Sequence, residues 1–100
     1  MLIIEGWVRF APGELDKLTQ VTAIMIAETL KEPGCLHYSF ARDMVDPDLM
    51  RISERWDSQE ALDAHSTAPH MAAFGAGLAQ VERLGADLRL YSGDEIKRIM

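Results

Sequence analysis

The chain has 100 residues, of which 48% are hydrophobic and 26% are charged, and its formal net charge is −6. This length corresponds to one small domain with a single core, and the balance of apolar and charged residues excludes a disordered chain. The acidic excess argues against a nucleic-acid-binding groove, which needs clustered positive charge to release the counterions of phosphate groups.

The N-terminal stretch lacks the features of a targeting or membrane segment. No basic residue precedes its apolar run, and Glu5 interrupts that run after four residues, whereas a bilayer-spanning helix needs about 20. The single cysteine, Cys35, has no partner for an internal disulfide. We therefore expect a cytoplasmic protein that does not associate with a membrane.

The first two elements are predicted to be a strand and a long helix. Residues Leu2–Phe10 alternate between two faces, and one face carries the apolar side chains Leu2, Ile4, Val8 and Phe10. After a Pro-Gly turn, Glu14–Leu30 has apolar residues at helical spacing and acidic residues in its first turn. The sequence Glu32-Pro33-Gly34 ends this helix.

Two further strands, Cys35–Asp43 and Leu49–Trp56, are predicted to form a hairpin around the turn Asp46-Pro47-Asp48. In the first strand, alternation places Leu36, Tyr38 and Phe40 on one face and Cys35 and His37 on the opposite face. In the second strand, one face carries Met50, Ile52, Glu54 and Trp56.

The rest of the chain is predicted to form two helices and a last strand. Asp57, with Glu60, is expected to cap a short helix from Gln59 to about His65. Pro69 opens the next helix, for which Thr67 is the expected cap, and its apolar stripe consists of Met71, Phe74, Leu78 and Val81. The last predicted strand is Ala86–Tyr91.

The predicted order is β-α-β-β-α-β, which is the arrangement of the ferredoxin-like α+β folds. A four-stranded antiparallel sheet would carry its helices on one face. Residues 1–92 would form this domain, and residues 93–100 a C-terminal tail. The other sheet face retains large apolar groups such as Trp7, so we expect a second copy to cover it in a homodimer that the tail can also contact.

His65 is the first candidate for chemistry, because an imidazole titrates near neutrality and this one ends a short helix just before the break at Pro69. The alternative is a structural histidine that fastens the break by bonding to the backbone. His70 lies five residues further, which is not the spacing of a helical metal pair, and His37 is expected on the face opposite Tyr38. We therefore expect no metal site and place His70 at a pocket rim or as a helix cap.

Four apolar side chains are candidates for the wall of a pocket that binds a flat aromatic substrate, and the alternative for each is a place in the core: Tyr38, Trp56, Met71 and Phe74. Glu54 is the odd member of an apolar face. We expect it to form an ion pair with an arginine, or else to act as an acid–base group.

Three motifs resemble those of the antibiotic biosynthesis monooxygenase (ABM) domain family, which includes the quinol monooxygenases. They are Glu32-Pro33-Gly34-Cys35-Leu36-x-Tyr38, then Glu54-x-Trp56, and then Ala61-Leu62-x-Ala64-His65-x-x-x-Pro69-His70. The resemblance covers nearly the whole chain. It implies a dimeric α+β barrel in which each subunit holds a ligand pocket between its sheet and its helices.

Quinol-oxidising members of that family oxygenate electron-rich aromatics without metal or flavin. The resemblance therefore implies a monooxygenase that needs no cofactor, uses O₂, and oxidises a quinol or polyphenol after His65 helps to remove a proton. A non-oxidative isomerase using the same pocket, and a small-ligand-binding protein without turnover, remain the alternatives.

Overall fold

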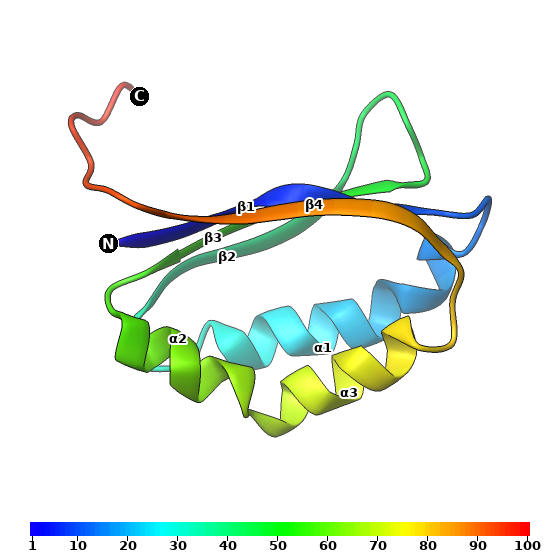
Figure 1. Ribbon diagram of the computed structural model, residues 1–100, viewed down its shortest axis with the longest axis horizontal. Helices are drawn as coiled ribbons and strands as arrows, with labels where there is room; N and C mark the ends of the chain where they lie inside the picture. The colour runs from blue at the N-terminus through cyan, green and yellow to red at the C-terminus, as the bar shows by residue number, and fades with distance from the viewer.

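The computed structural model describes residues 1–100 and has the predicted order of elements (Figure 1). The strands are β1 (Leu2–Phe10), β2 (Cys35–Arg42), β3 (Leu49–Trp56) and β4 (Arg83–Ser92). The helices are α1 (Thr19–Thr29), which follows a 3₁₀ turn at Leu15–Leu18, then α2 (Gln59–Ser66) and α3 (Pro69–Leu78). None of these helices is long and apolar enough to cross a membrane.

The four strands form one antiparallel sheet in the order β2-β3-β1-β4, and the helices lie together on one of its faces (Figure 1). The predicted ferredoxin-like α+β fold is thereby confirmed. The register aligns Tyr38 of β2, Glu54 of β3 and Ile4 of β1 in one row across the sheet. Since side chains in such a row share a face, this row meets the helical layer.

The hydrophobic core fills the space between the sheet and the helices. It consists of Phe10, Leu15, Leu18, Met25, Tyr38, Met50, Ile52, Trp56 and Phe74. Met25 of α1 and Trp56 of β3 have no exposed surface at all. Helix α1 packs against both α3 and β2, which explains why its apolar surface is wider than the stripe one sheet face needs.

A β-bulge near the start of β2 changes the predicted alternation. The register shifts between Cys35 and His37, so that Cys35 lies opposite Trp56 and Tyr38 lies opposite Glu54. Because the bulge adds one residue, Cys35 faces the core together with Tyr38, while Leu36 is 54% exposed. The prediction that Leu36 shares a face with Tyr38, opposite Cys35, is wrong.

The helix caps also differ from those predicted. The cap of α2 is Ser58 rather than Asp57, because its extended backbone places Oγ 3.1 Å from the amide of Ala61. Helix α3 begins after Ala68 without a side-chain cap. The hydroxyl of Thr67 instead donates to the carbonyl of Ala64, at 3.1 Å.

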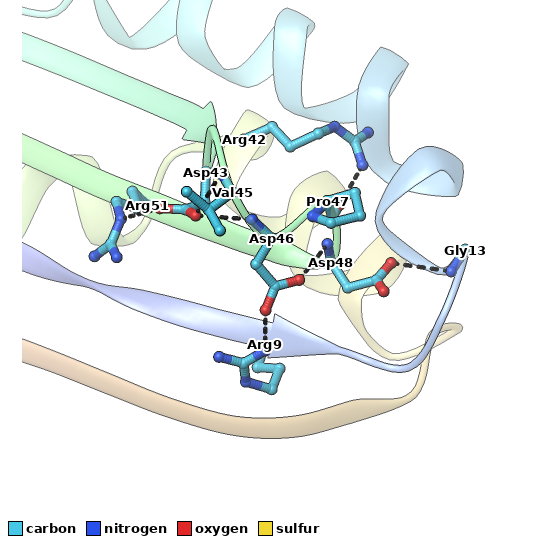
Figure 2. Close-up of polar contacts among 9 residues, drawn as sticks. All are labelled: Arg9, Gly13, Arg42, Asp43, Val45, Asp46, Pro47, Asp48 and Arg51. Carbon is cyan, nitrogen blue, oxygen red and sulfur yellow. Dashed lines mark hydrogen bonds and ion pairs between the residues drawn. The ribbon is translucent and has the colours of Figure 1, made fainter.

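The loop between β2 and β3 is held by its aspartates (Figure 2). Asp43 accepts hydrogen bonds from the amides of Val45, at 3.0 Å, and Asp46, at 2.9 Å, and from Nε of Arg51, at 2.7 Å. The Arg51 hydrogen bond, followed by those two amides, lowers the pKa of Asp43 to about 2. Asp46 also pairs with Arg9 (Figure 2), so the loop is tied to β1 as well as to its own hairpin.

The outer strand β4 is poorly covered even on the helical side of the sheet. Its register places Leu88 opposite Gly6 and Leu90 opposite Ile4, which are positions of the helix-facing side. Both leucines are nevertheless about half exposed. The three helices therefore shelter the inner strands and leave this edge strand open.

The close approach of β1 and β4 leads to a stability prediction. A Cβ on Gly6 would lie 1.9 Å from the carbonyl oxygen of Asp87, so Gly6→Ala must push the two strands apart. We expect urea unfolding to show a loss of at least about 2 kcal/mol. The matched control is Gly75→Ala in α3, where a Cβ meets no atom within 4 Å and a gain of about 0.5–1 kcal/mol is expected. Equal unfolding midpoints for the two variants would contradict this account.

Candidate functional site

His65 lies in the last turn of α2 and is only 3% exposed. Its Nδ1 is 2.7 Å from Oε2 of Glu32. With a carboxylate as partner, Nδ1 carries the proton and donates it, which leaves the lone pair of the neutral ring on Nε2. A purely structural role for His65 predicted a hydrogen bond from its ring to the backbone of the helix break. The ring instead bonds to the side chain of Glu32.

Glu32 is a site residue that the sequence reasoning assigned only to a turn. It follows α1 and precedes Gly34, whose φ of +85° favours glycine because other residues are strained there. The same Oε2 that contacts His65 is also 3.3 Å from Nε2 of His70. The three ligand-type atoms lie within 4.8 Å of one another. The only signal for Glu32 was its place at the start of the Glu-Pro-Gly motif.

Two aromatic rings fix the orientation of the His65 imidazole. The ring of Trp56 packs on it with centroids 4.7 Å apart, and Tyr38 meets it edge-on at 5.2 Å. The indole of Trp56 is fully buried, and its Nε1 donates to Oε1 of Glu54 at 3.0 Å. The structure thus brings the sequence candidates His65, Tyr38, Trp56 and Glu54 into one cluster, and His70 joins it through Glu32.

Glu54 does not form the predicted ion pair. It faces the helical layer and is 6% exposed, and its hydrogen-bond donor is the neutral indole of Trp56. Burial raises the pKa of Glu54, and the Trp56 hydrogen bond and the nearby His65 oppose that rise. The arginines of β3 alternate with Glu54 and point to the other face, which is why no arginine reaches it.

The raised pKa of Glu54 predicts a particular dependence of stability on pH. Between the unfolded and the folded pKa, the folded state holds more protons, so stability falls as the pH rises through that interval. Glu54→Gln keeps an acceptor for Trp56 and removes the buried charge. We expect this variant to melt at a higher temperature than the wild type at pH 7, with a difference that shrinks toward pH 4. A difference in melting temperature between the variant and the wild type that is the same at every pH would contradict this. Glu60→Gln, at an exposed position, serves as the control.

The neighbours of the Tyr38 hydroxyl are the sulfur atoms of two methionines. The hydroxyl donates to Sδ of Met25 at 3.6 Å and lies 3.8 Å from Sδ of Met71. Burial, reinforced by the charge of Glu54, raises the pKa of Tyr38 well above its usual value. Tyr38 therefore stays protonated and is available as a donor, not as a base.

The predicted aromatic wall is packed rather than hollow. Phe74 of α3 is buried and meets Phe40 edge-on at 5.8 Å, and Phe40 lies 5.1 Å from Tyr38. Of the predicted wall, Met71 joins the cluster through Tyr38, whereas Phe74 contacts it only through Phe40. The space beside His65 is thus filled by side chains, of which the methionines are the most adaptable.

A separate cavity of about 290 Å³ opens between α1 and the edge of β2. Its walls include Leu18, Phe40 and Met50, and none of the predicted site residues lines it. Its polar groups are Arg42, which pairs with Asp16 at 2.6 Å, Thr19, whose hydroxyl donates to the carbonyl of Asp16, and Thr22, whose hydroxyl is buried without a partner. The broad apolar character of α1 was the only sequence signal for this cavity.

A ferredoxin-like sheet with a carboxylate-bound histidine beneath it defines an α+β protein with a candidate acid–base site. The family model for antibiotic biosynthesis monooxygenase matches residues 1–77, and the chain belongs to this family. The solved structure of a candidate antibiotic biosynthesis monooxygenase from Deinococcus radiodurans is 25% identical, with a TM-score of 0.86, over 100% of this chain and 99% of that one.

Two other relatives are more distant. A structure from Mycobacterium tuberculosis is 22% identical and has a TM-score of 0.82 over 96% of this chain and 98% of that one, which supports the fold alone. A protein from Synechocystis is 23% identical over 90 residues, which make up 90% of this chain and 61% of that protein. The chain thus spans less than two thirds of that relative's length.

Proposed function

We propose that the protein is a monooxygenase that oxidises a quinol or another polyphenol with O₂ and without a bound cofactor. The observation that carries the proposal is the buried pair of His65 and Glu32, joined at 2.7 Å. The carboxylate holds the ring in the tautomer whose Nε2 can accept a proton, as the acidic member of a catalytic triad does. The family to which the chain belongs supports oxygenation as the reaction.

The chemistry balances without an external reductant. His65 takes a proton from a hydroxyl of the quinol, and the resulting anion transfers one electron to O₂. The radical pair combines to form a carbon–oxygen bond, and the hydroperoxide, protonated by His65, loses water to leave a carbonyl. One oxygen atom enters the product and the other leaves as water, with all four electrons supplied by the substrate. The protein contributes proton transfer, orientation and exclusion of water.

The substrate would lie beside His65, in the space that Met71 and Met25 occupy in the free protein. Their sulfur atoms contact the hydroxyl of Tyr38, and a methionine side chain can change rotamer at small cost. Once both methionine side chains move, the Tyr38 hydroxyl is free to donate to an oxygen of the substrate. Tyr38, Trp56, His70, Met71 and Phe74 remain the proposed substrate-binding residues.

The direct test is incubation of metal-free protein with a menadiol-type quinol under ¹⁸O₂. We expect a rate above that in buffer and one ¹⁸O atom in the product, detected by mass spectrometry. A rate equal to that in buffer would refute the proposal. Formation of unlabelled quinone with hydrogen peroxide would also refute it, because that outcome is oxidation without oxygen insertion.

A non-oxidative isomerase is the second candidate, and the Glu32–His65 pair supports it as well. A carboxylate-oriented imidazole can move a proton between two carbons of a small metabolite as readily as it can deprotonate a phenol. Such a reaction proceeds equally fast in the absence of oxygen. Turnover of a substrate in an anaerobic chamber therefore separates the two candidates.

We further propose that two copies pair through the helix-free face of the sheet. Trp7 and Tyr91 lie on that face and border a hollow of about 450 Å³ that charged residues also line. Beyond β4, the tail carries exposed Ile96 and Ile99, which would contact the partner in this pairing. Light scattering should give twice the mass of one chain, and Trp7→Arg should lower it. A monomeric wild type would contradict the pairing.

A further inference from the structure

Three metal-ligating side chains converge at one end of the helical layer. Glu32 follows α1, His65 ends α2 and His70 lies in the first turn of α3. Oε2 of Glu32 lies 2.7 Å from Nδ1 of His65 and 3.3 Å from Nε2 of His70. All three atoms are within 4.8 Å of one another. The helix break at Pro69 brings together two histidines that a continuous helix would place on different sides.

We infer that Glu32, His65 and His70 form a binding site for one divalent transition-metal ion, best fitted by Zn²⁺. Two imidazole nitrogens and one carboxylate oxygen are one of the donor sets found in three-ligand zinc sites, which keep a fourth position for water or substrate. Mg²⁺ and Ca²⁺ prefer oxygen ligands. Because this site offers only one carboxylate and two nitrogens, those two ions are poor occupants.

Two of the three separations between ligand atoms are close to those of a metal site, and the third, between the two histidines, is at most 4.8 Å. Metal–ligand bonds of 2.0–2.2 Å in a tetrahedral site separate neighbouring ligand atoms by about 3.3 Å. The Glu32–His70 separation already has that value, and the Glu32–His65 separation needs an opening of only about half an ångström. In the free protein, the two histidines and the carboxylate are held in place by the same hydrogen bonds that the metal would replace.

The surroundings keep the site ordered and leave it accessible. The His65 side chain is 4% exposed and is packed against Trp56 and Tyr38, so its ring cannot turn away. The side chains of Glu32 and His70 are 17% and 14% exposed, which gives an ion a route from solvent.

Metal binding and the proposed base role of His65 exclude each other. An imidazole bound to a metal through Nδ1 carries its proton on Nε2 and cannot accept one from a substrate. Zn²⁺ should therefore inhibit the oxidation, and a chelator should restore it. This inhibition rests on the proposed function, whereas the binding of the metal does not.

The test is titration of the chelator-treated protein with Zn²⁺ by calorimetry, with Mg²⁺ as the comparison ion. We expect one Zn²⁺ per chain, a melting temperature that rises with Zn²⁺ concentration, and no heat with Mg²⁺. His70→Ala and Glu32→Gln should each weaken Zn²⁺ binding about tenfold or more. His37→Ala, on the opposite sheet face, is the matched control and should bind as the wild type does.

Zn²⁺ binding that is absent, or equally strong in His70→Ala and His37→Ala, would overturn the inference. His70 is partly exposed, so its replacement is expected to fold, and circular dichroism of each variant checks this. A protein that binds one Zn²⁺ but does not oxidise quinols would support the metal site and refute the proposed oxidation. A protein that oxidises quinols and ignores Zn²⁺ would do the reverse.

Discussion

Replacing His65 with alanine is expected to slow quinol oxidation about 10²- to 10⁴-fold, which is the usual contribution of a general base. The loss should fall mainly on kcat, because the imidazole acts on the proton that moves during the reaction. Glu32→Gln should cost less, about 10- to 100-fold, since the amide of this variant can still contact the ring but does not carry the charge that fixes its tautomer.

His37→Ala is the matched control for this prediction. His37 is a histidine of strand β2, and the register places it opposite Arg55, on the helix-free face of the sheet. Its replacement should leave the rate unchanged. If His65→Ala and His37→Ala oxidise the quinol equally fast, His65 is not the base. Because His65 packs against Trp56, the melting temperature of each variant must be measured together with its rate.

Replacing Trp56 with alanine should have the largest effect on stability, a loss of about 3–5 kcal/mol. The indole is fully buried, packs on His65 and donates the hydrogen bond that Glu54 accepts. Its removal leaves a cavity and a buried carboxyl group without a donor, and both effects act in the same direction. Small domains are stable by only about 5–15 kcal/mol, so the variant is expected to be close to unfolded at 37 °C.

One further variant separates the contributions at this position, and a variant at an exposed position serves as the control. Trp56→Phe keeps most of the apolar surface but lacks the N–H, so it measures the cost of leaving Glu54 without its donor, about 1–3 kcal/mol. Leu36→Ala, at an exposed position of β2, should change stability by less than about 0.5 kcal/mol. A Trp56→Ala protein as stable as Leu36→Ala would contradict the packing described for the core.

The order of the elements could be predicted because its signals are local. Proline and glycine mark the turns, and the apolar period changes from strand to helix within a few residues. The alternation of β2 could not be predicted at its start. The bulge there is a shift in the pairing of β2 with β3, with Cys35 opposite Trp56, and such pairing is a contact between strands. The cap of α2 could not be assigned for a different reason, because Asp57 and Ser58 are both favoured cap residues and the extended backbone of Ser58 decides between them.

The site was predictable in part. The family motifs include His65, and its position before a helix break made it a candidate. Its partner Glu32 is 33 residues away in the sequence and meets it only because the β2–β3 hairpin returns the chain to the end of α1. The periodic pattern of apolar residues along the sequence does not indicate a contact between residues so far apart. Glu54 does not form the expected ion pair because the arginines of β3 point to the other face of the sheet, and Trp56, two residues along the same strand, supplies its donor instead.

The contact between the rings of Trp56 and His65 gives the protein an internal optical reporter. A protonated imidazole quenches the fluorescence of an indole that it touches, and the two rings lie 4.7 Å apart. Trp7 is the other tryptophan and lies on the far side of the sheet, so Trp7→Phe leaves Trp56 as the single emitter. The emission of that variant should follow the charge of His65, and it would register a proton, a metal ion or a bound substrate without any added label.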